Sequence, residues 1–232
     1  MKSISILLLF INFSFAQSDT NKLDENGKKH GSWKGFFEDS KRLRYEGTFE
    51  HGKEIGTFNY YDDTKAVNII GVRVFNSKDN SAYTTFYDQK KNIVSEGKVI
   101  DKLKDGIWKY YHESSKVIMT LENYKLGKID GLKTIYYKDG KIAEETNFSN
   151  GIKNGIYKNL SEKGILLETV SFKNDEYDGL ATYKDISDKI TAQGIFKDGK
   201  KIGIWKFFTD GKLVKSENFN KQGKKFQKKI KV

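Results

Sequence analysis

Residues 203–219 read GIWKFFTDGKLVKSENF, and this stretch has the pattern of a β-hairpin. A short aromatic run is followed by Asp210-Gly211, a pair that favours a type I′ turn because glycine adopts positive φ without steric cost. The residues from Leu213 to Phe219 then alternate between apolar and polar, which is the period of a strand. A two-residue turn at Asp210-Gly211 would place Phe208 opposite Leu213.

The same pattern recurs along most of the chain. Its glycines, which we expect to shape the turns between units, are Gly31, Gly56, Gly106, Gly131, Gly155, Gly179 and Gly203. Their spacing is 24 or 25 residues where consecutive, with Ser81 in the one gap. A unit this short holds two strands and two turns, and sequential strands usually pair. We therefore predict that residues 31–220 form an all-β, elongated antiparallel meander or solenoid of about eight 24–25-residue β-hairpin repeats.

Some units depart from this pattern or repeat it with small changes. Asp139-Gly140 indicates the same tight turn in the fifth unit, which would place Tyr137 opposite Ile142. In the third unit, Ser81 replaces the anchor glycine and Asn76-Ser77 replaces the glycine of the link. We expect that link to be bulged or irregular.

The first 16 residues have the pattern of a secretory signal peptide. Lys2 supplies a positive charge, an apolar run follows, and Ser14-Phe15-Ala16 provides a small-residue cleavage site. Residues 1–16 are therefore predicted to be removed after Ala16; an uncleaved anchor is the alternative. The run is shorter than the roughly 20 apolar residues of a membrane span, and no later stretch approaches one. We expect an exported chain in the periplasm, on the cell surface or in the medium.

The two ends of the mature chain differ from the repeats. Residues 17–30 are polar, and their last part resembles half a unit, which suggests an N-terminal cap. Residues 221–232 form a basic C-terminal end. Its lysines that we expect to present a basic surface are Lys224, Lys225, Lys228, Lys229 and Lys231. Such a cluster suits anionic lipid or acidic glycan, while a solvated end that blocks aggregation is the alternative.

The repeated unit, G-x-W-K-Y/F-Y/F-x-D-G-K-L followed by F-x-x-G-K-x-x-G, resembles the variant MORN repeat of many bacterial proteins. The resemblance covers roughly residues 24–223. It implies a single-layer β array, since related eukaryotic MORN repeats form such arrays and are implicated in lipid or partner binding and in scaffolding. Some bacterial members of the variant family are labelled antitoxins.

The composition argues against catalysis. The chain has no cysteine and three histidines, which leaves no thiolate site and no multi-histidine motif. His112 lies near Ser114 and Ser115 in sequence, but a catalytic triad is defined by geometry rather than proximity along the chain. We expect no enzyme activity, no cofactor and no metal. The formal net charge is +11, yet no nucleic-acid-binding signature is present, so nucleic acid is not an expected partner.

Aromatic residues offer a second candidate surface. The hairpin pairing places the second aromatic of each pair with the aliphatic residues and the first on the opposite face. The residues that we expect to contact a partner are Trp108, Tyr110, Tyr136, Trp205 and Phe207. Large exposed apolar patches usually mark binding sites. The alternative is that the array packs these rings against itself.

Together these features predict an exported, non-catalytic binding or scaffold protein of the bacterial envelope or exterior. Its partner would be a protein, a glycan or an anionic lipid held along the repeat surface. An antitoxin or immunity-type protein that neutralises a cognate toxin is the alternative.

Overall fold

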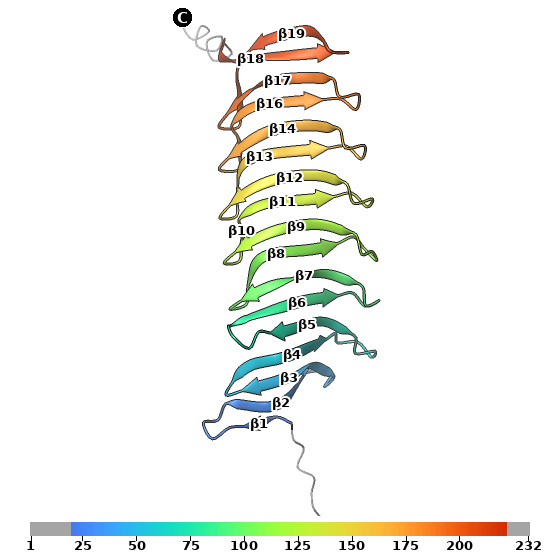
Figure 1. The fold of residues 1–232 in the computed structure, drawn as a ribbon, viewed down its shortest axis with the longest axis vertical. Coiled ribbons are helices and arrows are strands. Elements are labelled where there is room, and N and C mark those ends of the chain that lie inside the picture. Colours follow the sequence, from blue (N-terminus) through green and yellow to red (C-terminus); the bar gives the residue numbers. More distant parts are fainter. Residues whose placement is uncertain (1–19, 222–232) are drawn as a thin grey trace, which may run out of the picture.

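The computed structural model describes residues 20–221, and they form one open antiparallel sheet of 19 strands. The strands stack along a single long axis in chain order (Figure 1). A 3₁₀ turn, Phe219–Lys221, follows the last strand. The predicted all-β hairpin meander is therefore confirmed.

The strands of the first half lie between the N-terminal edge of the sheet and its middle. They are β1 Lys22–Leu23, β2 Lys29–Phe36, β3 Leu43–Glu50, β4 Lys53–Tyr61, β5 Ile69–Phe75, β6 Ser81–Tyr87, β7 Ile93–Ile100, β8 Leu103–Tyr111 and β9 Ile118–Lys125. The strands of the second half are β10 Lys128–Ile129, β11 Gly131–Tyr136, β12 Ile142–Ser149, β13 Ile152–Leu160, β14 Leu166–Lys173, β15 Glu176–Tyr177, β16 Gly179–Lys184, β17 Ile190–Lys197, β18 Lys200–Thr209 and β19 Lys212–Asn218.

Each strand pairs with its neighbours in the chain. The short strands β10 and β15 are the first parts of interrupted strands, because β11 also pairs with β9 and β16 with β14. At the N-terminal edge, β1 pairs with β2, and the Trp33 indole donates a hydrogen bond to the Lys22 carbonyl at 3.0 Å. This short strand covers part of the edge of β2.

The tight type I′ turns lie mainly between units. Both central residues have positive φ at His51-Gly52 (47° and 85°) and at Asn150-Gly151 (50° and 87°). Asp210-Gly211 adopts the same turn, and Phe208 faces Leu213 as predicted. Alternating strands joined by two-residue I′ turns keep the right-handed twist of the sheet.

The prediction for Asp139-Gly140 was wrong. Only Gly140 of the two has positive φ, its N–H donates to the Tyr137 carbonyl at 2.9 Å, and Tyr136, not Tyr137, faces Ile142. This is the longer hairpin loop in which a turn is followed by a left-handed residue. Gly140 lies nine residues after its anchor glycine, whereas Gly211 lies eight after its own, so the extra residue lengthens the loop.

The anchor glycines are not turn residues, which corrects our expectation. Gly31, Gly56, Gly106, Gly131, Gly155, Gly179 and Gly203 all have positive φ, but each lies within or at the start of a strand. At Gly106 (φ 67°) the register between β7 and β8 shifts between Gly97 and Lys98, so the glycine lies in a β-bulge. Only glycine adopts such a φ inside a strand without steric cost.

The third unit is irregular, as predicted. Its link is the loop of residues 76–80, which the Asn76 N–H closes by donating to the Ser81 carbonyl at 2.9 Å. The phase of the repeat is already shifted by one residue in β5, before this link, because Tyr61 pairs with Ile69 eight residues on, whereas Tyr111 pairs with Ile118 seven residues on. Phe75 and Ala82 pack among the buried side chains, whereas Val74 is 51% exposed.

Candidate functional site

One face of the sheet, here called the aromatic face, carries Trp33, Phe58, Trp108 and Trp205. These rings contact further rings of the neighbouring strands, at centroid distances such as 5.1 Å from Phe49 to Phe58. The sheet has no second layer in residues 20–221, so side chains of successive hairpins cover one another along the axis. Phe58, Trp108 and Trp205 are 0–2% exposed.

On the aromatic face, a glycine of one hairpin can lie opposite a large ring of the next hairpin. A β-carbon added to Gly47, Gly97 or Gly194 would come within 2.5 Å of the ring that covers it. These rings are Phe58, Trp108 and Trp205. In other hairpins a smaller side chain lies with a larger one, or the two are oppositely charged: Thr146 faces Tyr157, Val170 packs with Ala181, and Lys133 forms an ion pair with Glu122 at 3.2 Å. Complementary pairs therefore continue the packing where no glycine is present.

Lysine side chains cover the ring clusters. The Lys104 ammonium lies 4.6 Å from the Trp108 ring centroid, 5.0 Å from that of Tyr110 and 4.8 Å from that of Tyr124. Lys29 lies in the same way over Trp33, Tyr45 and Phe49, and Lys201 over Trp205, Phe207 and Phe219. A cation over several rings is attracted by their negative faces. Lysines of the protein itself therefore occupy the position over these rings that a ligand would otherwise take.

Burial shifts the pKa of the groups in the central cluster. Burial lowers the pKa of the Lys104 ammonium, although the Glu122 carboxylate opposes this shift. Burial, and then the hydrogen bond with Tyr124, raise the pKa of the Tyr110 hydroxyl well above its usual value. The Tyr124 hydroxyl donates to Glu122 at 2.7 Å. The cluster is a satisfied polar network around a lysine.

The predicted contact residues are not an exposed aromatic surface. Trp108 and Trp205 are buried, which corrects the expectation that they meet a partner; they are core residues. Tyr110 and Phe207 are half-buried beside them. Tyr136 follows Ile135 in β11 and is out of phase with Lys133, so alternation places it on the opposite face. The array packs these rings against itself, as the alternative proposed.

The predicted basic surface lies outside the described residues. Lys224, Lys225, Lys228, Lys229 and Lys231 all fall in residues 222–232. The predicted signal peptide, residues 1–16, also lies outside them. Within residues 20–221, no helical segment has the length and hydrophobicity of a membrane span.

The opposite face, here called the aliphatic face, is more exposed. Lysine and glutamate pair across its strands: Lys34 with Glu46 at 3.8 Å, Lys109 with Glu96 at 3.5 Å and Lys158 with Glu145 at 2.9 Å. Beside these pairs runs a row of branched aliphatic side chains, one from each of the last five units and each directly after an anchor glycine. This aliphatic row is Ile107, Leu132, Ile156, Leu180 and Ile204.

The aliphatic row is open to solvent. Ile107 and Ile204 are each 59% exposed and Leu180 is 58% exposed. Successive members are two strands apart, about 10 Å at the usual strand spacing. We did not single out this row in the sequence, although the position after the anchor glycine is aliphatic in each of the last five units. That column was the signal that could have revealed it.

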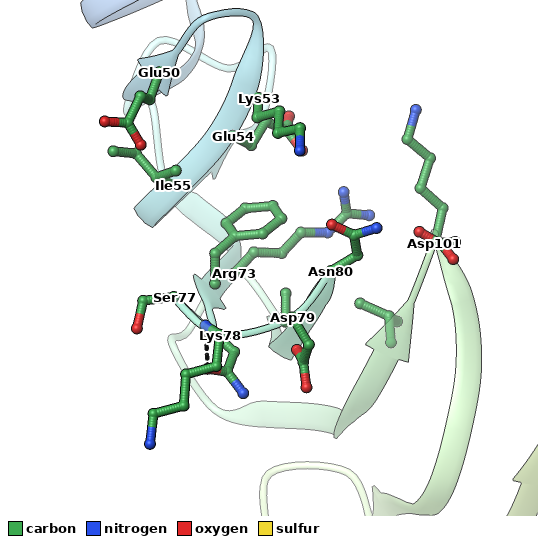
Figure 2. A pocket seen from close by; sticks show the side chains of 15 residues that line it. Glu50, Lys53, Glu54, Ile55, Arg73, Ser77, Lys78, Asp79, Asn80 and Asp101 are labelled. Atoms are coloured by element: carbon green, nitrogen blue, oxygen red, sulfur yellow. Dashed lines mark hydrogen bonds between the residues drawn. The ribbon is translucent and has the colours of Figure 1, made fainter.

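The irregular third link creates a groove of about 580 Å³. Figure 2 shows its walls: the turn from β3 to β4, the loop of residues 76–80 and the turn from β7 to β8. Four acidic and four basic side chains line the groove. The acidic residues are Glu50, Glu54, Asp79 and Asp101, and the basic residues are Lys53, Arg73, Lys78 and Lys102. The hydrogen bonds that Asp79 accepts from Ser81 lower the pKa of its carboxyl group. The balanced charge favours neither an anion nor a cation.

Comparisons with known proteins were made for the whole chain. No family model matches it, and no curated protein does. Among solved structures, a protein of unknown function from Bacteroides fragilis is similar over 83% of this chain and 94% of that one, with 9% identity and a TM-score of 0.12. We infer neither fold nor activity from that similarity.

Proposed function

We propose that this protein is an exported, non-catalytic scaffold that binds a protein partner along its aliphatic face. The observation that carries the proposal is the exposed aliphatic row. Exposed apolar side chains gathered on one face are a common mark of an interaction surface, and here they alternate with Asn123, Asn147 and Ser171 of the intervening strands. A row repeated about every 10 Å suits a partner with apolar groups at matching intervals.

The chemistry of the two faces favours a protein over a glycan or a lipid. Sugar rings stack on flat aromatic side chains, but the rings of the aromatic face are buried or covered by lysines such as Lys104. Branched aliphatic side chains offer no flat surface for a sugar. Several lysines beside the aliphatic row are paired with glutamates, as Lys158 is with Glu145, which reduces the positive charge that this face offers to anionic lipid.

The scaffold role agrees with the resemblance of the unit to variant MORN repeats. Export is proposed from the pattern of residues 1–16 alone. Fractionation of the native cell, with the N-terminus determined by mass spectrometry, tests it. A chain that starts at Gln17 in the envelope or medium supports export. A full-length cytosolic chain contradicts export and favours the antitoxin or immunity role instead.

The binding surface is tested by changing the aliphatic row to threonine. Threonine has the β-branched shape that strands favour, and Ser32 and Thr57 occupy the same position in the first two units. The variant changes the four most exposed members of the row: Ile107→Thr/Ile156→Thr/Leu180→Thr/Ile204→Thr. Partners are captured by cross-linking in the native envelope fraction and quantified by mass spectrometry.

A matched control removes exposed apolar side chains outside the row. Ile186 is 70% exposed and Leu103 is 48% exposed. The variant Ile186→Thr/Leu103→Thr therefore lowers the hydrophobicity of the protein surface and leaves the aliphatic row unchanged. We expect the row variant to capture at least tenfold less partner than the parent chain, and the control variant to capture as much as the parent chain. Equal capture by both variants would contradict binding through the row. A tight one-to-one complex with a toxin would support the antitoxin alternative.

A further inference from the structure

Two of the three histidines meet a carboxylate at the N-terminal end of the array. The ligand atoms of Asp24, His30 and His51 all lie within 4.8 Å of one another. The Asp24 Oδ2 atom lies 2.7 Å from His51 Nδ1, and the two imidazole rings are 4.9 Å apart at their centroids. These residues are 6 and 21 positions apart in sequence, and only the pairing of the hairpins unites them.

The backbone holds the three residues in place. Asp24 lies in the turn from β1 to β2, where its N–H donates to the Lys28 carbonyl at 2.8 Å. His51 lies in the type I′ turn from β3 to β4, and the next residue, Gly52, donates its N–H to the Lys29 carbonyl of β2 at 2.8 Å. His30 is the neighbour of Lys29 in β2. Each ligand therefore belongs to a hydrogen-bonded element, and only side-chain torsions remain free.

The Asp24 carboxylate is oriented for a ligand role. Its Oδ1 atom accepts hydrogen bonds from the N–H groups of Asn26 and Lys28, each at 2.9 Å. This leaves Oδ2 directed toward the histidines. The Asp24 side chain is 7% exposed and that of His51 is 62% exposed, so the cluster opens to solvent on the histidine side. The neighbouring Lys29 ammonium points away from it, toward the Tyr45 hydroxyl at 3.0 Å.

We propose that Asp24, His30 and His51 bind a divalent transition metal ion, with zinc as the reference ion. Imidazole and carboxylate are ordinary zinc ligands, with bonds of about 2.0–2.2 Å. Tetrahedral coordination at those lengths sets ligand atoms about 3.3 Å apart. The ligand atoms now lie within 4.8 Å of one another, so metal binding would require the exposed histidine side chains to rotate into that geometry. A fourth position is left for water or for a group of a partner.

The bound metal ion would join the turn from β1 to β2 to the turn from β3 to β4. It would thereby strengthen the N-terminal edge, where β1 has only two residues. This inference reverses our expectation that a chain with three histidines has no metal site. It does not depend on the proposed partner surface, because the aliphatic row begins at Ile107.

The test is zinc binding by the full chain without an affinity tag, measured by equilibrium dialysis and metal analysis. We expect one zinc ion per chain and a cobalt(II) derivative with visible absorption typical of nitrogen and oxygen ligands. Asp24→Asn, His30→Asn and His51→Asn should each weaken zinc binding at least tenfold. Magnesium should not compete, since it prefers oxygen ligands.

The variants are chosen to preserve the fold. Asparagine at position 24 still accepts the turn hydrogen bonds, and asparagine tolerates the φ of 47° at position 51, as Asn150 does in a later turn. His112→Asn is the matched control, because the His112 ring bonds the Tyr136 carbonyl at 3.0 Å, far from the cluster in sequence. Zinc binding that survives in a variant carrying all three asparagine substitutions, or a folded parent chain that binds no zinc, would overturn the proposal.

Discussion

The indole ring of Trp108 covers the α-carbon of Gly97, its partner on the neighbouring strand. A β-carbon at position 97 would lie 2.5 Å from the ring, and the indole N–H donates to the Lys98 carbonyl at 2.8 Å. The glycine therefore makes room for the largest side chain of the core. The same relationship joins Gly194 to Trp205.

This pair predicts a strong coupling between two substitutions. Gly97→Val should cost about 1–3 kcal/mol through overpacking, and Trp108→Ala about 3–5 kcal/mol through the cavity it leaves. The double variant imitates the natural pair of Val170 and Ala181. The double variant should lose at least about 1 kcal/mol less unfolding free energy than the two single variants lose together, as measured by urea unfolding. Additive losses would contradict the proposed contact.

Adjacent residues of β18 should respond very differently to truncation. Trp205 is fully buried, whereas Ile204 is 59% exposed on the aliphatic face. Trp205→Ala should destabilise the protein by about 3–5 kcal/mol, and Ile204→Thr by no more than about 0.5 kcal/mol. Far-UV circular dichroism during urea unfolding measures both. A large loss for Ile204→Thr would indicate that the aliphatic row is part of the core.

Leu126 offers a route to higher stability. It occupies the first central position of a type I′ turn with φ 49°, yet its side chain is 72% exposed. A leucine in the left-handed region costs roughly 1–2 kcal/mol, which asparagine largely avoids. Leu126→Asn should therefore stabilise the protein by about 1 kcal/mol in urea unfolding. The reverse change, Asn150→Leu, is the control and should destabilise it by a similar amount.

Tyr111 predicts a loss of stability in alkali. Burial, and then the hydrogen bond to Glu96, raise the pKa of its hydroxyl to about 12. In the unfolded chain the hydroxyl titrates near 10, so above that pH the unfolded state releases a proton that the folded state retains. The stabilising contribution is complete below pH 10 and is lost as the pH rises toward 12.

The variant Tyr111→Phe isolates this contribution. Its urea midpoint should fall less than that of the parent chain between pH 9 and pH 11.5. Absorbance at 295 nm should also show one fewer tyrosine titrating near pH 12. Identical pH profiles for the two proteins would contradict the assignment to Tyr111.

The sequence predicted the fold well and the candidate site poorly. The period of 24–25 residues, the alternation after Leu213 and the Asp210-Gly211 turn were sufficient to predict a hairpin meander. They did not predict which face would be covered. One residue inserted or omitted in a strand before a bulge moves every later side chain of that strand to the other face. For this reason we wrongly predicted Tyr136 to lie on the same face as Trp108.

The sequence by itself determined the strands, the tight turn at Asp210-Gly211 and the irregularity of the third link, because these depend on local φ preferences and alternation. Only the tertiary structure decided that Trp108 and Trp205 are core residues and that Ile107 and Ile204 are exposed. In a single-layer sheet, burial comes from neighbouring hairpins, through a glycine opposite a large ring and, over Trp33, Trp108 and Trp205, through a lysine. The register between hairpins sets those contacts, and the same register brings Asp24, His30 and His51 together.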